Sequence, residues 1–481
     1  MVMSTGKLAL AILWLLPVCT VCQRTTDDIA TSVMEVVKFR SPTLALTHLR
    51  IIDGTGAAPH ENQTLIIGGG IVQSIAPSEN ARIPERARVV DLSGRTAFPG
   101  LVGMHDHLYY TAALYDSGPL LQQQSFTFPR LYLANGVTTI RTAGSIAPDT
   151  DLNLKNLIDA GEIPGPRIHF TGPYLEGPGG LLEMSSLRTP QETRATVEYW
   201  ADRGATSFKA YTHITRAQLQ AAVDAAHARG LKITGHLCSV GFQEAAEMGI
   251  DSLEHGFAVD TEFNSLKKPD LCPPGAFVGL TDIDVSGLEI RRLIHLLVRK
   301  HVAITSTLAV FEQYVSGRPD PSDSVLGLMS SVSRSSCLGQ RDDLRREQSS
   351  NQFGVVLKKE MLLERAFVKA GGLLMTGADP TGNGCVLAGF GDLRGLELLV
   401  EAGFTPTEVI QIATSNGAKF LGVSDKIGTL EPGKVADLVV VRGDPTKDIR
   451  DIENTETTFK DGLGYDPAKL LQQVKSNVGF H

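Results

Sequence analysis

The sequence predicts an α/β fold, namely a (β/α)8 TIM barrel that carries a small β-sandwich built from both chain ends. Residues 99–421 alternate apolar, strand-like runs with helix-like stretches, which is the element order of a parallel α/β domain. The flanking segments 43–98 and 422–465 instead consist of short strand-like runs separated by tight turns. At 481 residues, the chain is long enough for both units.

The first segment, residues 1–22, has the features of a secretory signal peptide. Lys7 precedes the apolar run 8–21, and the small residues Thr20 and Cys22 fit cleavage after Cys22. The apolar run is short for a membrane-spanning helix, and no basic stop-transfer flank follows it. We therefore expect an exported protein, periplasmic or secreted, without a stable membrane span once the signal is removed.

Removal of the signal would leave an even number of cysteines. They are Cys238, Cys272, Cys337 and Cys385. An oxidising compartment permits disulfides between them, and four cysteines allow three sets of pairs. Cys272 and Cys337 lie in polar, loop-like segments, so we favour a bond between these two.

The β-sandwich is predicted from the runs TLALTHLRIID, TLIIGGGIVQSIA and ARVVDLSGRTAF near the N-terminus. The glycine triplet 68–70 is expected to form a hairpin turn, because no helix and no GK[ST] ending follow it. The segment GTLEPGKVADLVVVRGDP near the other end has the same strand-and-turn character. We expect the two ends to fold together around the inserted barrel.

Eight strand-like runs are expected in the barrel. They are 101–107, 137–143, 167–172, 206–211, 231–237, 251–256, 302–308 and 373–379. A helix or another connection follows each run, and the chemistry of such barrels takes place at the carboxyl ends of the strands. Two segments near 260–299 and 312–352 are too long for simple connections, so we expect inserts that cover the site or join subunits.

Histidines at the end of the first barrel strand are the main clue to function. His105 and His107, in the stretch FPGLVGMHDH, are two residues apart and therefore project from one side of a strand. Two imidazoles on one side of a rigid strand form half of a zinc-type site. Four residues of suitable chemistry follow near later strand ends, namely Lys209, His236, His255 and Asp379.

Strand alternation predicts that these side chains meet. Lys209 and Tyr211 share one face of the fourth strand, and His236 and Asp379 take the equivalent place on the fifth and eighth. A lysine inside a barrel is costly unless it has a function, and burial favours its neutral amine. Beside two divalent cations, such an amine can take up carbon dioxide and form a carbamate that bridges the metals.

The ordered set of six residues resembles the amidohydrolase superfamily in its binuclear, carboxylated-lysine form. The likeness runs from about residue 43 to about 465 and includes the motifs IIDGTG, FPGLVGMHDH, GHL, LEHG, TGAD and GTLEPGKVADLVVV. The segments TGPYLEGPGG and FKDGLGYDPAKL are similar to the exported imidazolonepropionase-like and Xaa-Pro dipeptidase-like branch.

The resemblance implies two metal ions. His105 and His107 would bind the more buried ion together with Asp379. His236 and His255 would bind the more exposed ion. Zinc is the expected metal, although these ligand types also accept manganese, cobalt or iron.

The resemblance also implies how the reaction proceeds. Lys209, as a carbamate, would bridge the two metals together with a hydroxide. The two ions would clamp the attacking oxygen and the carbonyl oxygen. Asp379 would take the proton of the hydroxide and pass it to the leaving amine.

Four residues near strand ends are candidate substrate contacts. They are Tyr109, Arg141, Tyr211 and His213. Tyr211 is preferred because it shares a strand face with Lys209. Arg141 could receive a substrate carboxylate through a bidentate pair, or it could form a structural ion pair.

The resemblance implies a metal-dependent hydrolase that cleaves an amide or peptide-like C–N bond, with dipeptides or N-acyl amino acids as favoured substrates. The same metals could open a cyclic amide, such as an imidazolone, or a lactone. A deaminase generally uses one metal, so Lys209 speaks against that activity. The alternative from another class is a non-catalytic binding protein on the barrel scaffold, and the complete set of six residues weighs against it.

The charge pattern narrows the class of partner. The net charge is −8 and no block of lysine and arginine stands out, so nucleic acid is not an expected partner. We expect a small-molecule substrate, and no cofactor besides the metals and the carbamate. The inserts could build the interface of a homo-oligomer.

Overall fold

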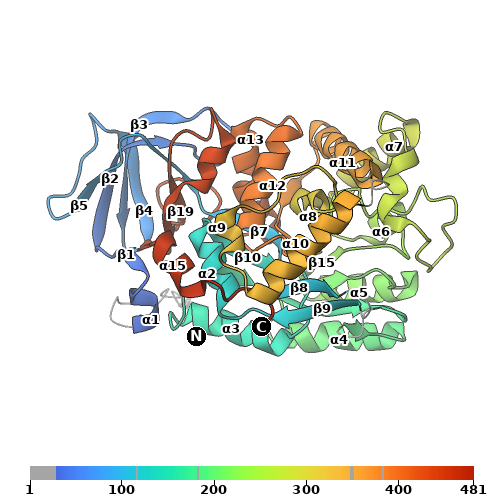
Figure 1. Ribbon diagram of the computed structural model, residues 1–481. Helices are drawn as coiled ribbons and strands as arrows, with labels where there is room; N and C mark the ends of the chain where they lie inside the picture. The colour runs from blue at the N-terminus through green and yellow to red at the C-terminus, as the bar shows by residue number, and fades with distance from the viewer. Residues whose placement is uncertain (1–28, 115–117, 181–183, 347–350, 382–383) are drawn as a thin grey trace, which may run out of the picture.

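The computed structural model of this chain describes residues 29–114, 118–180, 184–346, 351–381 and 384–481. The signal peptide expected at residues 1–22 lies outside the described residues. Figure 1 shows two units, with the strands of the β-sandwich at one end and the barrel with its helices beside them. The α/β fold that the sequence predicts, a TIM barrel with a β domain from both chain ends, is therefore confirmed.

Parallel strands form the eight barrel positions in the described chain. They are β7 (Leu101–Asp106), β10 (Val137–Thr142), the broken strand β11 (Arg167–His169) and β12 (Thr171–Glu176), β14 (Ser207–Ala210), β15 (Lys232–Gly235), β16 (Ser252–Glu254), β17 (Ala303–Ser306) and β18 (Leu374–Thr376). The third position extends to Glu176, beyond the expected end at 172. Gly172 and Pro173 suggest that the strand ends there. In the structure the strand continues, and the missing side chain at Gly172 makes room for the ring of Phe208, which packs against the strand.

A helix follows each barrel strand. In chain order the helices are α2 (Thr127–Ala134), α3 (Pro148–Asp159), α4 (Pro190–Asp202), α5 (Arg216–Ala228), α6 (Phe242–Met248), α7 (Leu288–Arg299), α11 (Asn351–Lys369) and α12 (Phe390–Glu401). At α5, Thr215 and Gln218 form a capping box.

The expected insert 260–299 is wrong at its carboxyl end, because α7 is the barrel helix after β16. Its residues Ile290, Leu293, Ile294 and Leu297 are buried at helical spacing. The irregular segment that precedes α7 is residues 257–287, which contain one short 3-10 helix, Ala276–Asp282. After β17, the short helices α8 (Leu308–Glu312) and α9 (Asp323–Leu326) and the longer α10 (Ser331–Arg346) precede α11.

The barrel closes between its last and first strands. The amide of Asp379 donates a hydrogen bond to the carbonyl of His105 at 2.8 Å. Gly377 allows this approach, since a Cβ at that position would lie 2.3 Å from the amide nitrogen of His105. The closure therefore brings the segments that carry His105 and Asp379 into direct contact.

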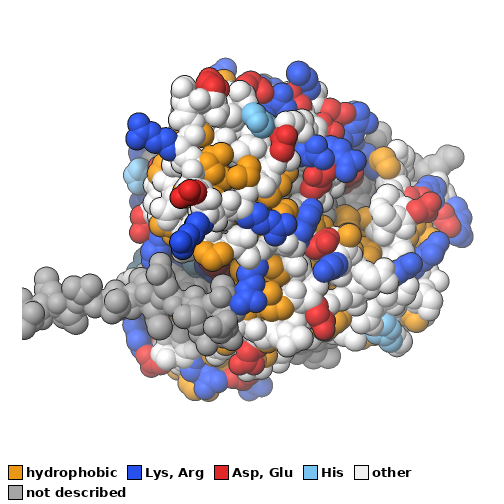
Figure 2. Space-filling view, turned by 90° about the vertical axis from the view of Figure 1, so that its left-hand side faces the viewer, with side chains coloured by type: hydrophobic (Ala, Val, Ile, Leu, Met, Phe, Trp, Pro, Cys, Tyr) orange, Lys and Arg blue, Asp and Glu red, His pale blue; other side chains and the backbone are white. Residues whose placement is uncertain are grey.

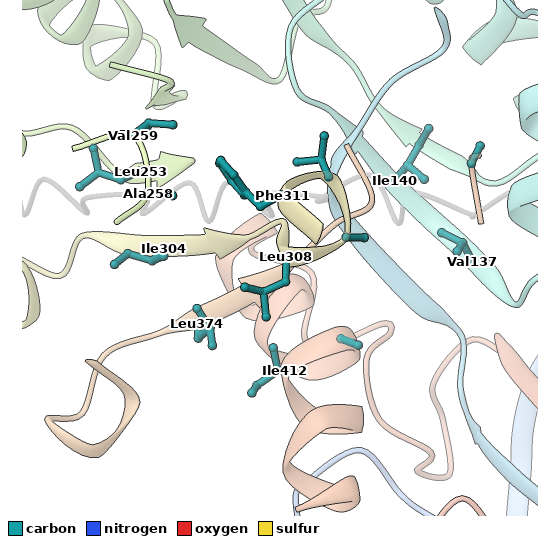
Figure 3. Packing of buried hydrophobic residues seen from close by; sticks show 14 of the residues in the cluster. Val137, Ile140, Leu253, Ala258, Val259, Ile304, Leu308, Phe311, Leu374 and Ile412 are labelled. Carbon is teal, nitrogen blue, oxygen red and sulfur yellow. The ribbon is translucent and has the colours of Figure 1, made fainter. Parts of the chain in front are cut away.

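The main hydrophobic core fills the space between the barrel strands and the surrounding helices. Figure 3 shows Ile140, Leu253, Ile304 and Leu374, one each from β10, β16, β17 and β18, among the side chains of this core. Neighbouring residues on the same strands, such as Glu254, have side chains on the opposite face. One face of each strand thus supplies the packing, and the other supplies the barrel interior.

Both chain ends join in one nine-stranded sheet of the described chain. Its strands are β1 (Val37–Phe39), β2 (Thr43–Ile51), β3 (His60–Gly68), β4 (Ile71–Pro77), β5 (Arg88–Asp91), β6 (Arg95–Pro99), β19 (Leu438–Arg442), β20 (Thr455–Lys460) and β21 (Leu463–Tyr465). The two halves meet where β6 pairs antiparallel with β19. Gly69 and Gly70 form the turn between β3 and β4 with φ of 61° and 80°, as the glycine triplet predicts. The sheet encloses its own apolar core.

The structure adds elements outside the expected sandwich boundaries. Helix α1 (Thr31–Met34) and β1 precede residue 43, and helix α15 (Pro467–Val474) follows residue 465 and packs on α2. The end of the chain then reaches α10, where Phe480 packs against the ring of Tyr110 at 5.7 Å between ring centroids. The C-terminal segment thus ties the β domain to the barrel.

Two disulfides use all four cysteines beyond residue 22. Cys238 pairs with Cys272 and Cys337 with Cys385, with Cα separations of 4.9 and 5.2 Å. The expected Cys272–Cys337 bond is therefore wrong. The polar sequence around Cys337 misled the prediction, because Cys337 lies within α10 and is fully buried, where it meets the buried Cys385 that follows β18.

The outside of the molecule mixes both signs of charge. Figure 2 shows lysine, arginine and acidic side chains interspersed over one face, with apolar side chains between them. Within the described residues, no helix combines the length and the apolar character that crossing a membrane requires.

A buried ion pair lies inside the barrel. The guanidinium of Arg141 donates to the Glu254 carboxylate at 2.6 Å and to the carbonyl oxygen of Met104 at 2.8 Å. Burial alone would raise the pKa of Glu254, but Arg141 and His105 hold it well below its usual value. Arg141 is 1% exposed. The expectation that it contacts substrate is therefore corrected in favour of the structural ion pair.

Removal of the arginine should leave the buried Glu254 carboxylate without its guanidinium counter-ion, with only the hydrogen bond from His105. We expect Arg141→Met to lower the free energy of unfolding by about 3–5 kcal/mol, measured by urea denaturation. Arg203, an exposed arginine paired with Asp149, offers a matched control, and Arg203→Met should cost less than about 1 kcal/mol. Unchanged stability of the Arg141 variant, with a raised KM for carboxylate substrates, would restore the substrate role.

Peptide mapping without reduction should find the pairs Cys238–Cys272 and Cys337–Cys385. The bonds close loops of 34 and 48 residues, so opening either one should cost about 3–4 kcal/mol of stability by the loop-entropy argument. A crosslinked peptide that contains Cys272 and Cys337 would contradict this pattern.

Candidate active site

Six side chains meet at the carboxyl mouth of the barrel, and we call them the mouth cluster. They are His105, His107, Lys209, His236, His255 and Asp379, and all six are buried. Lys209 lies within β14, whereas His236 and His255 are the first residues after β15 and β16. Every residue that the sequence analysis selected as a metal ligand is therefore in this cluster.

The Asp379 carboxylate lies among three imidazoles. Its Oδ1 atom is 3.2 Å from Nε2 of His107 and 3.7 Å from Nε2 of His105, and its Oδ2 atom is 3.6 Å from Nδ1 of His255. Burial alone would raise the pKa of Asp379, but the adjacent histidines hold it well below its usual value. The carboxylate is thus ionised at neutral pH.

The Lys209 amine points into the same space. Its Nζ atom is 3.0 Å from Nε2 of His105, and it lies 5.7 and 5.8 Å from the ring centroids of Tyr174 and Tyr211. Burial lowers the pKa of Lys209 to about 8. A substantial fraction of this amine is therefore neutral near physiological pH.

Burial also keeps the imidazoles neutral. It lowers the pKa of His107 to about 4 and that of His236 to about 3, and it holds the pKa of His255 well below the usual value. The rings are close together, with 4.4 Å between the centroids of His105 and His255 and 4.3 Å between those of His255 and His236. Neutral imidazole is the form that binds a metal ion.

Neighbouring side chains orient two of these rings. Nδ1 of His105 is 2.7 Å from the Glu254 carboxylate, and Nδ1 of His255 is 2.8 Å from the hydroxyl of Thr307. An ionised carboxylate only accepts hydrogen bonds, so Nδ1 of His105 carries the proton and Nε2 keeps its lone pair. This arrangement of carboxylate, histidine and open nitrogen is typical of metal ligands.

Two members of the cluster have unusual backbone conformations. His255 and Asp379 have φ of 66° and 43°, in the left-handed region that residues other than glycine rarely occupy. Both residues follow the ends of short strands. Such strain persists where the surrounding structure imposes it, and it concentrates at functional sites.

The donor atoms fit a metal centre. Nδ1 of His107 and Nε2 of His255 are buried and have no hydrogen-bond partner among the described residues. The nitrogens of His105 and His107 and a carboxylate oxygen of Asp379 lie within 4.8 Å of one another. Imidazole nitrogens with a carboxylate oxygen suit zinc and similar divalent ions.

A cavity of about 420 Å³ opens above the cluster. Its volume is in the range of small-molecule sites. Tyr109 and Tyr211, two of the expected substrate contacts, line it. The ring of Tyr211 is 4.9 Å from that of His236, which places it directly beside the cluster.

The other two expected contacts do not line the cavity. Arg141 lies deeper in the barrel, in its pair with Glu254. His213 is turned toward Glu176, which accepts from its amide at 2.6 Å, and its imidazole is 3.4 Å from the same carboxylate. His213 thus contacts Glu176 in the loop after β14 and is not among the described lining residues, and its contact with substrate stays a prediction.

Sequence reasoning missed several cavity residues. An antiparallel hairpin of β8 (Tyr109–Leu114) and β9 (Gly118–Gln123), absent from the predicted strands, contributes to the wall. Tyr174 was missed because its strand was expected to end at residue 172. Glu254, which contacts His105 and does not line the cavity, was also missed. The sequence could have identified it as an inward-facing residue, because strand alternation places it on the inner face of β16, immediately before His255.

Comparison with known proteins agrees with this geometry. A model of the amidohydrolase family matches residues 96–463. A protein of Bifidobacterium longum, provisionally designated a prolidase, is 26% identical, covers 90% of this chain and 98% of its own, and has a TM-score of 0.65. Among curated protein sequences, none gives a significant match.

Two further solved structures share the fold. An Xaa-Pro dipeptidase with methionine bound in its active site is 22% identical, covers 88% of this chain and all of its own, and has a TM-score of 0.66. The ochratoxinase of A. niger is 16% identical, with 91% and 100% coverage and a TM-score of 0.66. The family match spans the whole barrel and every residue of the mouth cluster. This chain therefore belongs to the amidohydrolase family and is a hydrolase that acts on C–N bonds.

Proposed function

We propose that this chain is an exported, binuclear metal-dependent amidohydrolase that cleaves one amide bond of a small peptide-like substrate. The observation that carries the proposal is the mouth cluster, in which four imidazoles, one amine and one carboxylate are buried together at the base of a cavity. Such a set is costly to bury unless a ligand compensates it.

Two divalent ions, most simply zinc, fit the donors of the cluster. His105, His107 and Asp379 would hold one ion, and His236 and His255 the other. Bound divalent ions would polarise the scissile carbonyl group and lower the pKa of a water molecule. The ionised Asp379 is then positioned to accept a proton from that water and to deliver it to the leaving amine.

We propose that Lys209 carries a carbamate. This group would connect the two sets of metal ligands in the mouth cluster. Among the described residues that line the cavity, Asp379 is the only carboxylate, and Glu254 is engaged by Arg141. A second anionic group must therefore come from another source. The neutral Lys209 amine can attack carbon dioxide, which forms a new N–C bond and releases one proton.

The proposed substrates are dipeptides or N-acyl amino acids, each of which offers one amide bond. The similar Bifidobacterium longum protein, provisionally designated a prolidase, supports a peptide-like substrate. Export is supported by the signal-like segment at residues 1–22 and by the two disulfides, since such bonds persist in oxidising compartments.

Protein purified with bicarbonate should contain about two metal ions per chain and hydrolyse members of a panel of dipeptides and N-acyl amino acids. Lys209→Ala should lose the paired ions and at least 100-fold in kcat, with partial rescue by added short carboxylic acids. Lys232→Ala is the control, because Lys232 lies on the adjacent strand β15 with its side chain 43% exposed. If Lys209→Ala keeps two ions and the full rate unaided, the carbamate proposal is wrong.

Replacement of Asp379 by asparagine should separate proton transfer from metal binding. We expect Asp379→Asn to retain metal and to lose about 10²- to 10⁴-fold in kcat, the usual contribution of a positioned acid or base. The measurements are metal content and steady-state rate, with the exposed Asp224→Asn as control. An unchanged kcat would remove Asp379 from the proton relay.

A further inference from the structure

The wall of the cavity above the mouth cluster is aromatic and aliphatic. Six aromatic side chains line it, namely Tyr109, Tyr174, Tyr211, Phe311, Tyr314 and Phe353. Leu121, Met184 and Val310 add aliphatic surface between them. Rings on several sides of a cavity favour a ligand that presents rings or other flat apolar groups.

Apart from the mouth cluster, the polar side chains of the described wall are hydroxyls. The hydroxyls of Tyr109 and Tyr174 hydrogen-bond to each other at 2.5 Å. Thr111 and Thr381 supply two further hydroxyls at the wall. These groups can donate to and accept from an amide, but they cannot neutralise an ion.

The described wall contains no arginine, and its only lysine is Lys209. The amine of Lys209 faces His105 at the floor of the cavity. The nearest buried guanidinium, that of Arg141, is engaged by Glu254 and Met104. In the sequence, the undescribed internal segments 115–117, 181–183, 347–350 and 382–383 contain no lysine or arginine, but they contain the acidic residues Asp116, Glu183 and Glu347.

This wall chemistry discriminates between substrate types. A free dipeptide brings an ammonium and a carboxylate within a few bonds of its scissile amide. Both ions would lose water on entering the cavity, and an unpaired buried charge is far more costly than a buried ring. In the described wall, the only cationic side chain that could pair with the carboxylate of a dipeptide is Lys209, which already belongs to the mouth cluster.

We propose that the preferred substrate is an amide with uncharged groups on both sides of the scissile bond, at least one of them aromatic. End-blocked peptides and aryl or arylalkyl amides belong to this class, and free dipeptides do not. The inference rests on the proposed amide hydrolysis but revises its substrate class. Dipeptides and N-acyl amino acids both carry a charge beside the scissile amide, and we assign the described wall as the element that selects against such a charge.

Four compounds that share one amide bond test the inference on the metal-loaded protein. They are Phe-Phe, its des-amino form 3-phenylpropionyl-Phe, its des-carboxy form Phe-phenethylamide, and 3-phenylpropionyl-phenethylamide, which lacks both charges. We expect kcat/KM of the uncharged compound to exceed that of Phe-Phe by at least 10-fold, with the two singly charged compounds between them. Equal values, or the highest value for Phe-Phe, would overturn the inference.

Binding of uncleavable analogues separates this inference from the proposed hydrolysis. In the four matching ketones, a –CO–CH2– group replaces the amide, and calorimetry on the same protein measures their Kd. If the uncharged ketone binds tightest but no amide is cleaved, the proposed hydrolysis fails and the assignment of the wall stands. If the doubly charged ketone binds tightest, the assignment of the wall fails even where hydrolysis occurs.

A charge placed in the wall should shift the preference. Leu121 of β9 lines the cavity and packs with Tyr109, Tyr174 and Met184. Leu121→Arg should raise kcat/KM for the anionic 3-phenylpropionyl-Phe at least 5-fold relative to the uncharged compound. Leu121→Met, which keeps the wall apolar, should leave that ratio unchanged. An unchanged ratio in a folded, metal-loaded Leu121→Arg protein would show that the wall does not set the charge preference.

Discussion

The contact between the first and last barrel strands is the constraint on which the site depends. The hydrogen bond from the Asp379 amide to the His105 carbonyl closes the barrel, and the absence of a side chain at Gly377 allows it. The same contact brings the carboxylate of Asp379 within 3.2 Å of His107. Closure of the fold and assembly of the cluster are therefore one event, because parallel strands meet with all their carboxyl ends at one mouth.

Charge balance below the mouth supports this arrangement. Glu254 is fully buried and binds both Arg141 and His105, so one carboxylate neutralises a deep guanidinium and orients a candidate metal ligand. The pair also withdraws Arg141 from the cavity. Glu254 and Arg141 are thus paired below the cavity, while rings and aliphatic side chains form most of the described wall above the mouth cluster. This separation of a polar floor from an apolar wall is what makes the substrate inference possible.

The sequence predicts the parts of the molecule that depend on periodicity. Strand alternation correctly placed Lys209 on the inner face of its strand, and the glycine triplet correctly marked the turn after β3. The sequence-based prediction failed where contacts between distant residues determine the local structure. Gly172 and Pro173 suggest a break, yet packing carries the third strand position on to Glu176. His213 follows Lys209 closely along the chain, but Glu176 turns it away from the cavity.

Both disulfides lie close to the cluster in the chain, and this placement explains how irregular segments can form an ordered site. Cys238 follows His236 by two residues, and its partner Cys272 lies in the long segment before α7. Cys385 follows Asp379 by six residues, and its partner anchors α10. Loops normally supply specificity at the cost of order. Here each bond ties a segment that leads away from the cluster to a distant part of the chain. Such bonds restrict the motion of the segments that follow His236 and Asp379. The barrel therefore fixes the chemistry, and the connections around its mouth determine which amide reaches it.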